Sequence, residues 1–411
     1  MPSRQKPKIE NQTQAITELL TRGVEDVVVR EHLAAALRTG KKLRIKHGID
    51  PTGPRIHIGR AISLWKLRAF QNLGHKIVLI IGDFTAQIGD PSDKLAKRPI
   101  LTAAQVKAHA KGYLAQIGNI LDMKKTEVRY NSEWLAKLDF LQTAILAESF
   151  SAQQMLARRT FRERWDRGED ITMREFMYPL MQGYDSVAVK ANVEIGGTDQ
   201  LFNLHAGRTV QQHYKQSPQD IMMLQMLEGL DGRKMSTSWG NVVTIVDEPK
   251  DMYGKVMSLR DDLMEKYFTL CCPHLSLEEI KGLMARVLGG TESPRDTKMR
   301  LAREITTLYH GAQKAEAAEK EFVRVFQRRE APSAIKEFTL PNEFTVIDLM
   351  QGTGIITSKS EGRRLIEQGA VIFDGRKITL ADNATLHDSD VPDSAILQVG
   401  PRRFVKFKKN A

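Results

Sequence analysis

Cysteine is nearly absent from the sequence. Only Cys271 and Cys272 occur among 411 residues, and cysteines adjacent in the chain rarely form a structural disulfide or a zinc site. This scarcity excludes a disulfide framework, and we predict no metal site in the protein itself. A reducing compartment such as the cytoplasm suits such a sequence.

Long hydrophobic runs are also missing. The longest aliphatic run covers residues 77–81, far short of the ~20 apolar residues that cross a bilayer. The first residues, MPSRQKPKIENQTQ, lack the apolar core of a signal peptide. We therefore expect a soluble, cytoplasmic protein with no membrane partner.

Positive charge, by contrast, is in excess. The chain has 61 lysines and arginines against 50 acidic residues, which gives a formal net charge of +11 and a pI near 9.5. This excess favours a polyanionic partner, although an ordinary basic protein remains an alternative. The length allows two or three domains, each with its own core.

The apolar pattern of the first 230 residues alternates between strands and helices. Residues 43–49 and 76–82 are expected to be strands with a helix over 58–73 between them, which makes one βαβ unit. The other expected elements are a helical pattern over 11–37, helices near 102–118, 151–166, 172–190 and 198–215, and strands near 126–130 and 221–226. The alternation predicts an α/β fold with a doubly wound parallel sheet.

The pattern changes twice after residue 230. Strand character is lost over 247–328, which predicts a helical domain. After Pro341, short β-prone runs and a turn at Asp374-Gly375 predict a compact α+β module.

The junction over residues 49–60, IDPTGPRIHIGR, stands where a strand runs into a helix. Ligands of doubly wound sheets bind at such carboxyl ends of strands, and a helix N-terminus suits phosphate. Gly53 and Gly59 let a backbone come close, and His57 can donate a hydrogen bond to a transferring phosphoryl group. A plain helix cap or a solvated histidine is the alternative for His57.

A second polar stretch, LDGRKMSTSWGN over residues 230–241, supplies a lysine and three hydroxyl groups. Alone it fits a surface loop. Together with the junction, in this order, it resembles the paired HIGH and KMSKS signatures of class I aminoacyl-tRNA synthetases, which hold ATP from opposite sides. The resemblance implies a Rossmann-like catalytic domain.

Residues 178–185, YPLMQGYD, put Tyr178, Gln182 and Asp185 on one helical face. An ordinary polar surface is the alternative for such a face. The stretch resembles the tyrosine-binding helix of tyrosyl-tRNA synthetases. That resemblance implies that Asp185 accepts a hydrogen bond from the substrate phenol, while Tyr178, Gln182 and Asp90 hold its α-ammonium group.

Two further stretches resemble the same family. EIGGTDQLFN over 194–203 is similar to the segment that contacts ribose through the positions of Gly197, Asp199 and Gln200. GDPSDKLAKR over 89–98 is similar to a loop in which Lys94 and Arg98 neutralise pyrophosphate, with a solvated surface loop as the alternative.

The C-terminal module separates this chain from the related tryptophanyl-tRNA synthetases, which share the two signatures but lack it. Residues 358–371 resemble a small RNA-binding domain of many bacterial tyrosyl-tRNA synthetases. Cations interleaved with aromatic residues in the tail over 401–409 suit phosphate contact and base stacking. A merely solubilising tail is the alternative. The predicted RNA-binding residues are Lys359, Arg363, Arg364, Arg402 and Arg403.

The resemblance assigns the remaining site residues. The predicted catalytic residues are Thr52, His57, Arg60, Lys94, Arg98, Lys234 and Ser238. The predicted tyrosine-binding residues are Lys46, Asp90, Tyr178, Gln182, Asp185 and Gln200. The predicted ATP-binding residues are Gly48, Asp50, Thr52, His57, Gly59, Gly197, Asp199, Lys234, Met235 and Ser236.

Two signature positions depart from the family pattern. Arg60 replaces the last histidine of HIGH and Thr237 replaces the second lysine of KMSKS. Arg233, just before the loop signature, is a candidate substitute for that lysine. Lys46 stands where one branch of the family has a tyrosine that helps to bind the phenol, whereas another bacterial branch resembles this sequence there. Phenol recognition is therefore expected to rest more heavily on Asp185.

The sequence thus predicts a two-step ligase that forms tyrosyl-adenylate from L-tyrosine and ATP and then charges tRNA(Tyr). Mg²⁺ is expected to arrive with ATP. An adenylating enzyme that never uses tRNA and a non-catalytic RNA-binding paralogue remain as alternatives. The resemblance also implies a homodimer.

The predicted domains follow the same resemblance. They are a Rossmann-like catalytic domain over 1–230 with an inserted helical connective region, a KMSKS-type loop over 231–246, a helical anticodon-side domain over 247–328, a linker over 329–341 and a small RNA-binding domain over 342–411.

Overall fold

The structure is a computed structural model that describes residues 9–91, 101–235, 239–328, 335–400 and 403–409. The chain divides into two compact units, Met1–Gly311 and Ala312–Ala411. The first unit holds the sheet and most of the helices, and the second holds the C-terminal module. No helix among the described residues is both long and apolar enough to cross a membrane.

A mixed sheet forms the centre of the first unit. Its strands follow the spatial order β1-β6-β5-β2-β3-β4. They are β1 (Val24–Val28), β2 (Arg44–Ile49), β3 (Lys76–Ile81), β4 (Thr126–Tyr130), β5 (Val193–Gly197) and β6 (Asp220–Leu224). Neighbours from β6 to β4 pair in parallel, and only β1 runs antiparallel at one edge.

The strand order reverses between β2 and β5. From β2 the chain continues outward to β3 and β4, then returns to β5 on the other side of β2 and continues to β6. The connections after β2 and after β5 therefore leave in opposite directions at the carboxyl ends of neighbouring strands. Such a reversal opens a crevice at the sheet edge, which is where doubly wound folds bind ligands.

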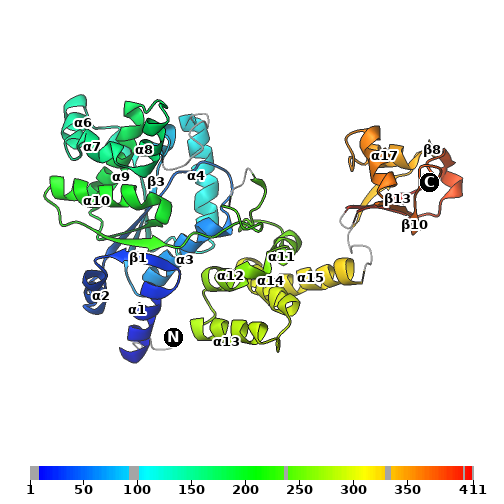
Figure 1. Cartoon of the computed structure of the whole chain (residues 1–411), viewed down its shortest axis with the longest axis horizontal. Helices are drawn as coiled ribbons and strands as arrows, with labels where there is room; N and C mark the ends of the chain where they lie inside the picture. The colour runs from blue at the N-terminus through cyan, green and yellow to red at the C-terminus, as the bar shows by residue number, and fades with distance from the viewer. Residues whose placement is uncertain (1–8, 92–100, 236–238, 329–334, 401–402, 410–411) are drawn as a thin grey trace. The chain divides into compact units, whose positions relative to one another are not determined.

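Helices cover both faces of this sheet (Figure 1). The helices α9 and α10 lie on one face, and α1 and α3 lie on the other. The helices of this part are α1 (Ile9–Thr21), α2 (Arg30–Arg38), α3 (Ile58–Asn72), α4 (Ala103–Ile117), α5 (Ser132–Leu135), α6 (Phe140–Ala147), α7 (Ala152–Leu156), α8 (Arg159–Asp166), α9 (Met173–Val189) and α10 (Leu201–His213). Burial on both faces explains why β3, KIVLII, is almost continuously aliphatic.

Three details of the expected pattern were wrong. The helical pattern over 11–37 is interrupted by β1, and β1 makes the sheet mixed rather than wholly parallel. The strand β5 was not expected, because its sequence VEIGG has two glycines and a buried acid. The helix expected over 151–166 is two short helices, α7 and α8. The other expected strands and helices are present within a few residues.

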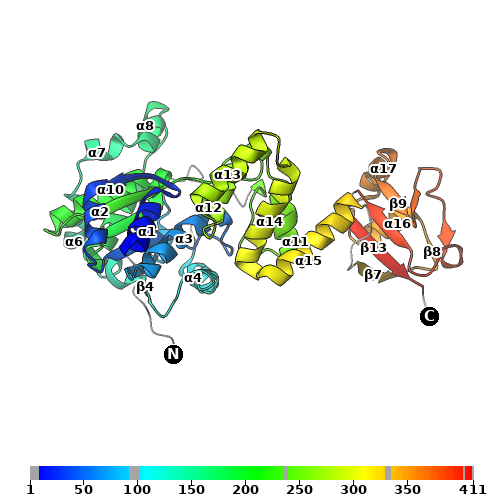
Figure 2. The same cartoon turned by 90° about the horizontal axis from the view of Figure 1, so that it is seen from below.

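A separate group of helices completes the first unit (Figure 2). It contains α11 (Pro249–Met257), α12 (Met264–Cys271), α13 (Leu277–Leu288) and α14 (Pro294–His310). Cys271 and Cys272 are buried here as free thiols. Because the compact unit ends at Gly311, these helices belong to the same unit as the sheet, whereas α15 (Ala312–Phe322) belongs to the second.

The second unit contains a small α+β module with its own core. Its larger sheet has the order β10-β9-β12-β13-β7, and β11 and β8 form a second, two-stranded antiparallel sheet. The elements are β7 (Lys336–Thr339), β8 (Glu343–Phe344), α16 (Val346–Gly352), α17 (Lys359–Glu367), β9 (Val371–Phe373), β10 (Arg376–Lys377), β11 (Leu386–His387), β12 (Ile396–Val399) and β13 (Arg403–Lys408). The predicted turn at Asp374-Gly375 joins β9 to β10, and both residues have positive φ.

Candidate active site

A cavity of about 1310 Å³ opens at the carboxyl ends of β2 and β5. Most of the predicted substrate residues line it although they come from distant parts of the chain. Those that do are Gly48, Asp50, Thr52, His57, Gly59, Arg60, Asp90, Tyr178, Gln182, Asp185, Gly197, Asp199, Gln200, Lys234 and Met235. The cavity thus lies at the point where the strand order reverses, as expected for this fold.

Some predicted residues do not line this cavity. Lys46 lies behind its wall and is fully buried. Lys94, Arg98, Ser236, Ser238 and Arg402 lie outside the described residues, as does Thr237.

The two signature segments are joined by main-chain hydrogen bonds. Ile58 N donates to Val243 O at 2.9 Å, and Ile245 N donates to Ile56 O at 2.9 Å. A Cβ added at Gly59 would come within 3.2 Å of the Met235 sulfur, so glycine at this position lets the loop approach the start of α3. The segment after the loop is therefore anchored beside His57, with Lys234 in the wall of the same cavity.

His57 is the N-cap of α3. Its Nδ1 accepts a hydrogen bond from Arg60 N at 3.3 Å, so the ring proton of the neutral imidazole belongs on Nε2. Burial, with the nearby Arg60 guanidinium, lowers the pKa of His57 to about 3. His57 is therefore a neutral hydrogen-bond donor at the helix N-terminus, which is what a phosphoryl group needs.

Arg60, which replaces the last histidine of the HIGH signature, bridges two parts of the cavity wall. Its guanidinium donates to Tyr113 Oη of α4 at 2.5 Å and to Thr52 Oγ1 at 3.4 Å. These contacts place a permanent positive charge beside Thr52 and His57. The arginine can therefore hold phosphate or ribose where the usual signature has an imidazole.

Asp185 lies at the base of the cavity and is held by two donors. Trp134 Nε1 donates to Oδ1 at 2.8 Å, and Asn131 Nδ2 lies 3.4 Å from Oδ2. Burial raises the pKa of Asp185 to about 7, although Lys46 and the Trp134 indole favour the charged form. A buried carboxylate of this kind can accept a further hydrogen bond from a phenolic hydroxyl group.

The raised pKa of Asp185 gives a testable dependence of stability on pH. The folded protein binds this proton at pH values where the unfolded chain, with an ordinary carboxyl pKa, has already lost it. The contribution of Asp185 to stability is therefore largest in acid and declines as pH rises towards the folded pKa of about 7. From about pH 5 to about pH 8, denaturation should show Asp185→Asn gaining about 2–3 kcal/mol relative to the unchanged protein. A difference that stays constant with pH would contradict this.

Asp50 and Tyr178 form a second buried pair. Tyr178 Oη donates to Asp50 Oδ2 at 2.9 Å, and Thr85 Oγ1 donates to Asp50 Oδ1 at 2.7 Å. Burial raises the pKa of Asp50 to about 6 and raises that of Tyr178 well above its usual value. The pair fixes α9 against the end of β2, so the Tyr178 hydroxyl is oriented by Asp50 before any ligand enters.

Asp90 is the centre of a cluster of amides. Gln200 Nε2 donates to Oδ2 at 2.8 Å, and Asn203 Nδ2 lies 3.4 Å from Oδ1. The guanidinium of Arg158 lies 3.9 Å from the same carboxylate and is packed between two phenylalanine rings. Asp90 is thereby held as an acceptor at the cavity wall, as its predicted contact with an ammonium group requires.

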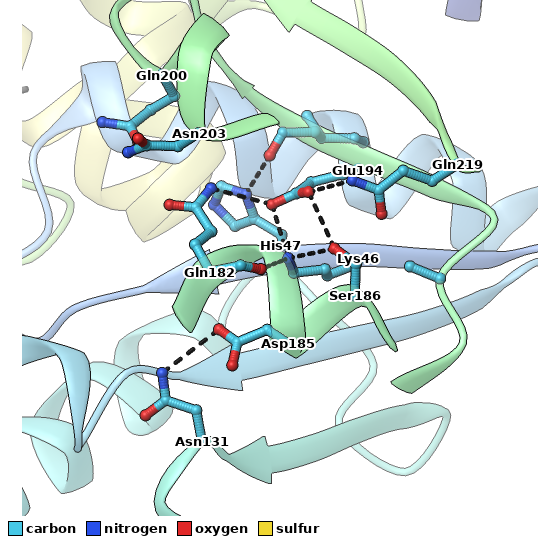
Figure 3. Close-up of polar contacts among 12 residues, drawn as sticks. Lys46, His47, Asn131, Gln182, Asp185, Ser186, Glu194, Gln200, Asn203 and Gln219 are labelled. Atoms are coloured by element: carbon cyan, nitrogen blue, oxygen red, sulfur yellow. Dashed lines mark hydrogen bonds and ion pairs between the residues drawn. The ribbon is translucent and has the colours of Figure 1, made fainter. Parts of the chain in front are cut away.

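Lys46 contacts protein groups on every side (Figure 3). Its Nζ lies 2.9 Å from Glu194 Oε1, 2.8 Å from Gln182 O and 2.7 Å from Ser186 Oγ. An ammonium group has three N–H donors, and all three have partners here. The expectation that Lys46 contacts the substrate is therefore replaced by a supporting position behind Gln182.

Arg233 does not line the cavity. Its guanidinium pairs with Asp231 at 2.6 Å and stacks over Trp239, with 5.1 Å from Cζ to the ring centroid. Asp231 also accepts a hydrogen bond from Asn241 at 2.8 Å, so it ties the two ends of the loop together. In this arrangement Arg233 stabilises the base of the loop.

The predicted RNA-binding residues of the second unit are exposed where they are described. Lys359 forms a 2.8 Å ion pair with Asp348, and Arg403 donates to Ile355 O at 2.7 Å. Arg363 and Arg364 lie on the same short helix, α17.

Several supporting residues were not found from the sequence. Glu194, Trp134, Asn131 and Arg158 all hold predicted site residues in place. Each is a single polar or aromatic residue whose partner lies far away in the sequence. None of the four carried a local signal, because the strand that buries Glu194 was itself not expected.

Comparison with known proteins agrees with the fold. The family model of the class I tRNA synthetases, which covers the tryptophan (W) and tyrosine (Y) enzymes, matches residues 38–327. A tyrosine–tRNA ligase of Moorella thermoacetica is 45% identical over 406 residues, which cover 97% of each chain. A tyrosine–tRNA ligase of Thermotoga maritima is 44% identical and covers 95% of this chain and 96% of its own.

Solved structures show the same fold at lower identity. A tyrosyl-tRNA synthetase of Archaeoglobus fulgidus in complex with L-tyrosine has a TM-score of 0.62 at 23% identity, covering 75% of this chain and 99% of its own. A truncated mitochondrial tyrosyl-tRNA synthetase of Coccidioides posadasii has a TM-score of 0.61 at 24% identity, covering 76% of this chain and 94% of its own. With a family match over most of its length and relatives of more than 40% identity across nearly all of it, the chain belongs to the class I tRNA synthetases, among the bacterial tyrosyl-tRNA synthetases.

Proposed function

We propose that this protein is a cytoplasmic tyrosine–tRNA ligase that activates L-tyrosine with ATP and transfers it to tRNA(Tyr). The observation that carries the proposal is one cavity that unites His57, Lys234 and Asp185 at the reversal of the strand order. Phosphate-binding groups lie along the junction after β2, and the phenol acceptor lies at the base. A nucleotide and an aromatic amino acid can thus meet in one site.

In the first step the carboxylate of tyrosine attacks the α-phosphate of ATP and displaces pyrophosphate. The residues around the cavity then act by position and charge. Neutral His57 donates a hydrogen bond to the phosphates, Arg60 and Lys234 supply positive charge, and Asp199 accepts from the ribose hydroxyls. In the second step the terminal ribose hydroxyl of tRNA attacks the adenylate carbonyl, the bond from that carbonyl to the phosphate breaks, and AMP leaves.

Magnesium fits this scheme as a companion of the nucleotide. Within the described ranges no group of three or more His, Cys, Asp or Glu side chains could hold a metal ion. In this proposal Mg²⁺ would be bound mainly by the phosphate oxygens of ATP and would neutralise their charge.

Pyrophosphate exchange tests the first step directly. The protein is incubated with ATP, labelled pyrophosphate and, in parallel, tyrosine, tryptophan or phenylalanine. We expect exchange with tyrosine alone. Exchange with tryptophan instead would reassign the substrate, and RNA binding without any exchange would favour the non-catalytic paralogue suggested by Arg60 and Thr237.

Removal of the C-terminal module tests the use of tRNA. The module has a core of its own, and its first strand, β7, begins at Lys336. A chain without residues 336–411 should keep pyrophosphate exchange within about twofold while losing tRNA charging by about tenfold or more, because the basic contacts to RNA phosphates are gone. Unchanged charging would instead support an adenylating enzyme that does not use tRNA.

The proposed homodimer has a candidate interface on α6. This helix buries Leu146 but exposes Phe140, Leu141 and Ile145, with Phe140 92% exposed. Exposed apolar side chains that cluster in this way mark interaction surfaces, and a second copy is the partner that the family resemblance implies.

Phe140→Glu tests this interface. In a symmetric dimer the substitution places one buried negative charge in each protomer at the interface. We therefore expect the dimer dissociation constant measured by sedimentation to rise by about 10²-fold or more. Leu288→Glu is the matched control, because Leu288 is 88% exposed on α13. Equal effects of the two substitutions on the dimer dissociation constant would show that α6 is not part of the interface.

A further inference from the structure

We infer that the buried Lys46–Glu194 ion pair orients the side-chain amide of Gln182, so that the amide oxygen faces the α-ammonium group of the amino acid. The inference rests on the proposed function and deepens it. It assigns Lys46 and Glu194 as positioning residues for amino-acid recognition, without contact to the substrate.

The pair bridges the two strands at which the strand order reverses. Lys46 of β2 and Glu194 of β5 are directly paired in the parallel ladder, and their side chains are 0% and 1% exposed. Nζ lies 2.9 Å from Glu194 Oε1, and its other donors contact Gln182 O and Ser186 Oγ of α9. The ammonium group therefore joins both strands to the helix that lines the cavity.

Glu194 determines which end of the Gln182 amide faces it. Its Oε1 accepts from Gln182 Nε2 at 3.1 Å. A carboxylate can only accept hydrogen bonds, so the NH₂ end of the amide must point to Glu194. Figure 3 shows the amide nitrogen turned towards Glu194 and the amide oxygen turned away from it.

The oxygen of Gln182 is then left for a ligand. Gln182 lines the cavity, and among the described residues its Oε1 accepts no hydrogen bond. Tyr178, Asp90 and Asp50 give the same wall further acceptor oxygens. A primary ammonium group, which carries three donors, is the ligand that such a wall recognises.

The rest of the network stabilises the carboxylate in this position. Glu194 Oε2 accepts from Ser186 Oγ at 3.3 Å and from Gln219 Nε2. A Cβ at Gly207 of α10 would collide with Gln219, Glu194 and Ser186, so only glycine leaves room here. A neutral amide in place of Glu194 could present either its oxygen or its nitrogen, and Gln182 would be free to turn over. The carboxylate removes this ambiguity, and Lys46 compensates the buried charge.

Glu194→Gln tests the inference with two ligands. The first is L-tyrosine, and the second is 3-(4-hydroxyphenyl)propionate, which keeps the phenol and the carboxylate but lacks the amino group. By calorimetry we expect the variant to lose about tenfold in affinity for tyrosine while its affinity for the deamino compound changes less than about twofold. Binding of the deamino compound also reports that the variant is folded.

Two further variants separate orientation from general support. Ser186→Ala removes contacts to both Lys46 and Glu194 but leaves the contact between Glu194 and Gln182, so the ratio of the two affinities should not change. Adding Gln182→Glu to Glu194→Gln restores a group at 182 that can only accept, so the preference for tyrosine should return.

The outcomes distinguish this inference from the proposed function. If Glu194→Gln weakens both ligands equally, or neither, the pair has no orienting role and the inference fails. If the added Gln182→Glu does not restore the preference, orientation of the amide is also refuted. If the unchanged protein does not bind tyrosine, the proposed function itself fails.

Discussion

Replacing His57 with alanine is expected to lower tyrosine-dependent pyrophosphate exchange by about 10²–10³-fold, the usual effect of removing one preorganised donor from a transition state. Tyrosine affinity should stay within about twofold, because Asp185, the proposed phenol acceptor, and Asp90 are held by side chains other than His57. Exchange kinetics and equilibrium binding of tyrosine measure the two effects separately.

The helix cap needs its own control, because His57 also caps α3. Serine is a good N-cap residue but does not reach the phosphates. His57→Ser should therefore keep the thermal stability of the protein and lose exchange as severely as the alanine variant. Full exchange in His57→Ser would mean that the imidazole acts only as a cap.

The ionisation state of His57 adds a second check. Because its pKa is about 3, the imidazole stays neutral over the whole physiological range. The pH profiles of exchange for the unchanged protein and for His57→Ser should therefore have the same shape near pH 6.5, with no inflection that only the unchanged protein shows. Such an inflection would indicate that the charged imidazolium is the active form.

The local parts of this site could be predicted from the sequence. A strand followed by a glycine- and proline-rich turn and a helix is encoded within about a dozen residues, so the position of His57 at the start of α3 followed from the pattern. The face formed by Tyr178, Gln182 and Asp185 likewise follows from helical spacing, and the structure places all three on the cavity wall.

The parts that depend on distant partners could not be predicted. The sequence VEDVV of β1 follows a helical pattern by itself, and it becomes a strand because it pairs with β6 almost 200 residues later. Lys46 was expected to contact the substrate, because its neighbours in sequence do not reveal that Glu194 lies opposite it in the sheet. Pairing across the sheet decides both cases, and a single sequence carries no local signal for it.

Asp185→Asn is expected to reduce the preference for tyrosine over phenylalanine by at least about 10²-fold in kcat/KM for exchange. Tyrosyl-tRNA synthetases are themselves the standard example of such rejection, at about 10⁵-fold, because a buried group left without its hydroxyl partner disfavours phenylalanine. The loss should fall mainly on tyrosine, since the asparagine nitrogen cannot accept from the phenol. Parallel exchange assays with the two amino acids measure the ratio.

The surroundings of Asp185 explain why asparagine is the informative replacement. It keeps the shape of the side chain, and its oxygen can still accept from Trp134, so the base of the cavity should remain packed. Asp220→Asn provides the matched control, because Asp220 is also a buried aspartate, on β6, but does not line the cavity. If both variants kept the full preference for tyrosine, phenol recognition would have to reside elsewhere in the cavity wall. A loss confined to Asp185→Asn would locate it at the single carboxylate that Trp134 and Asn131 hold in place.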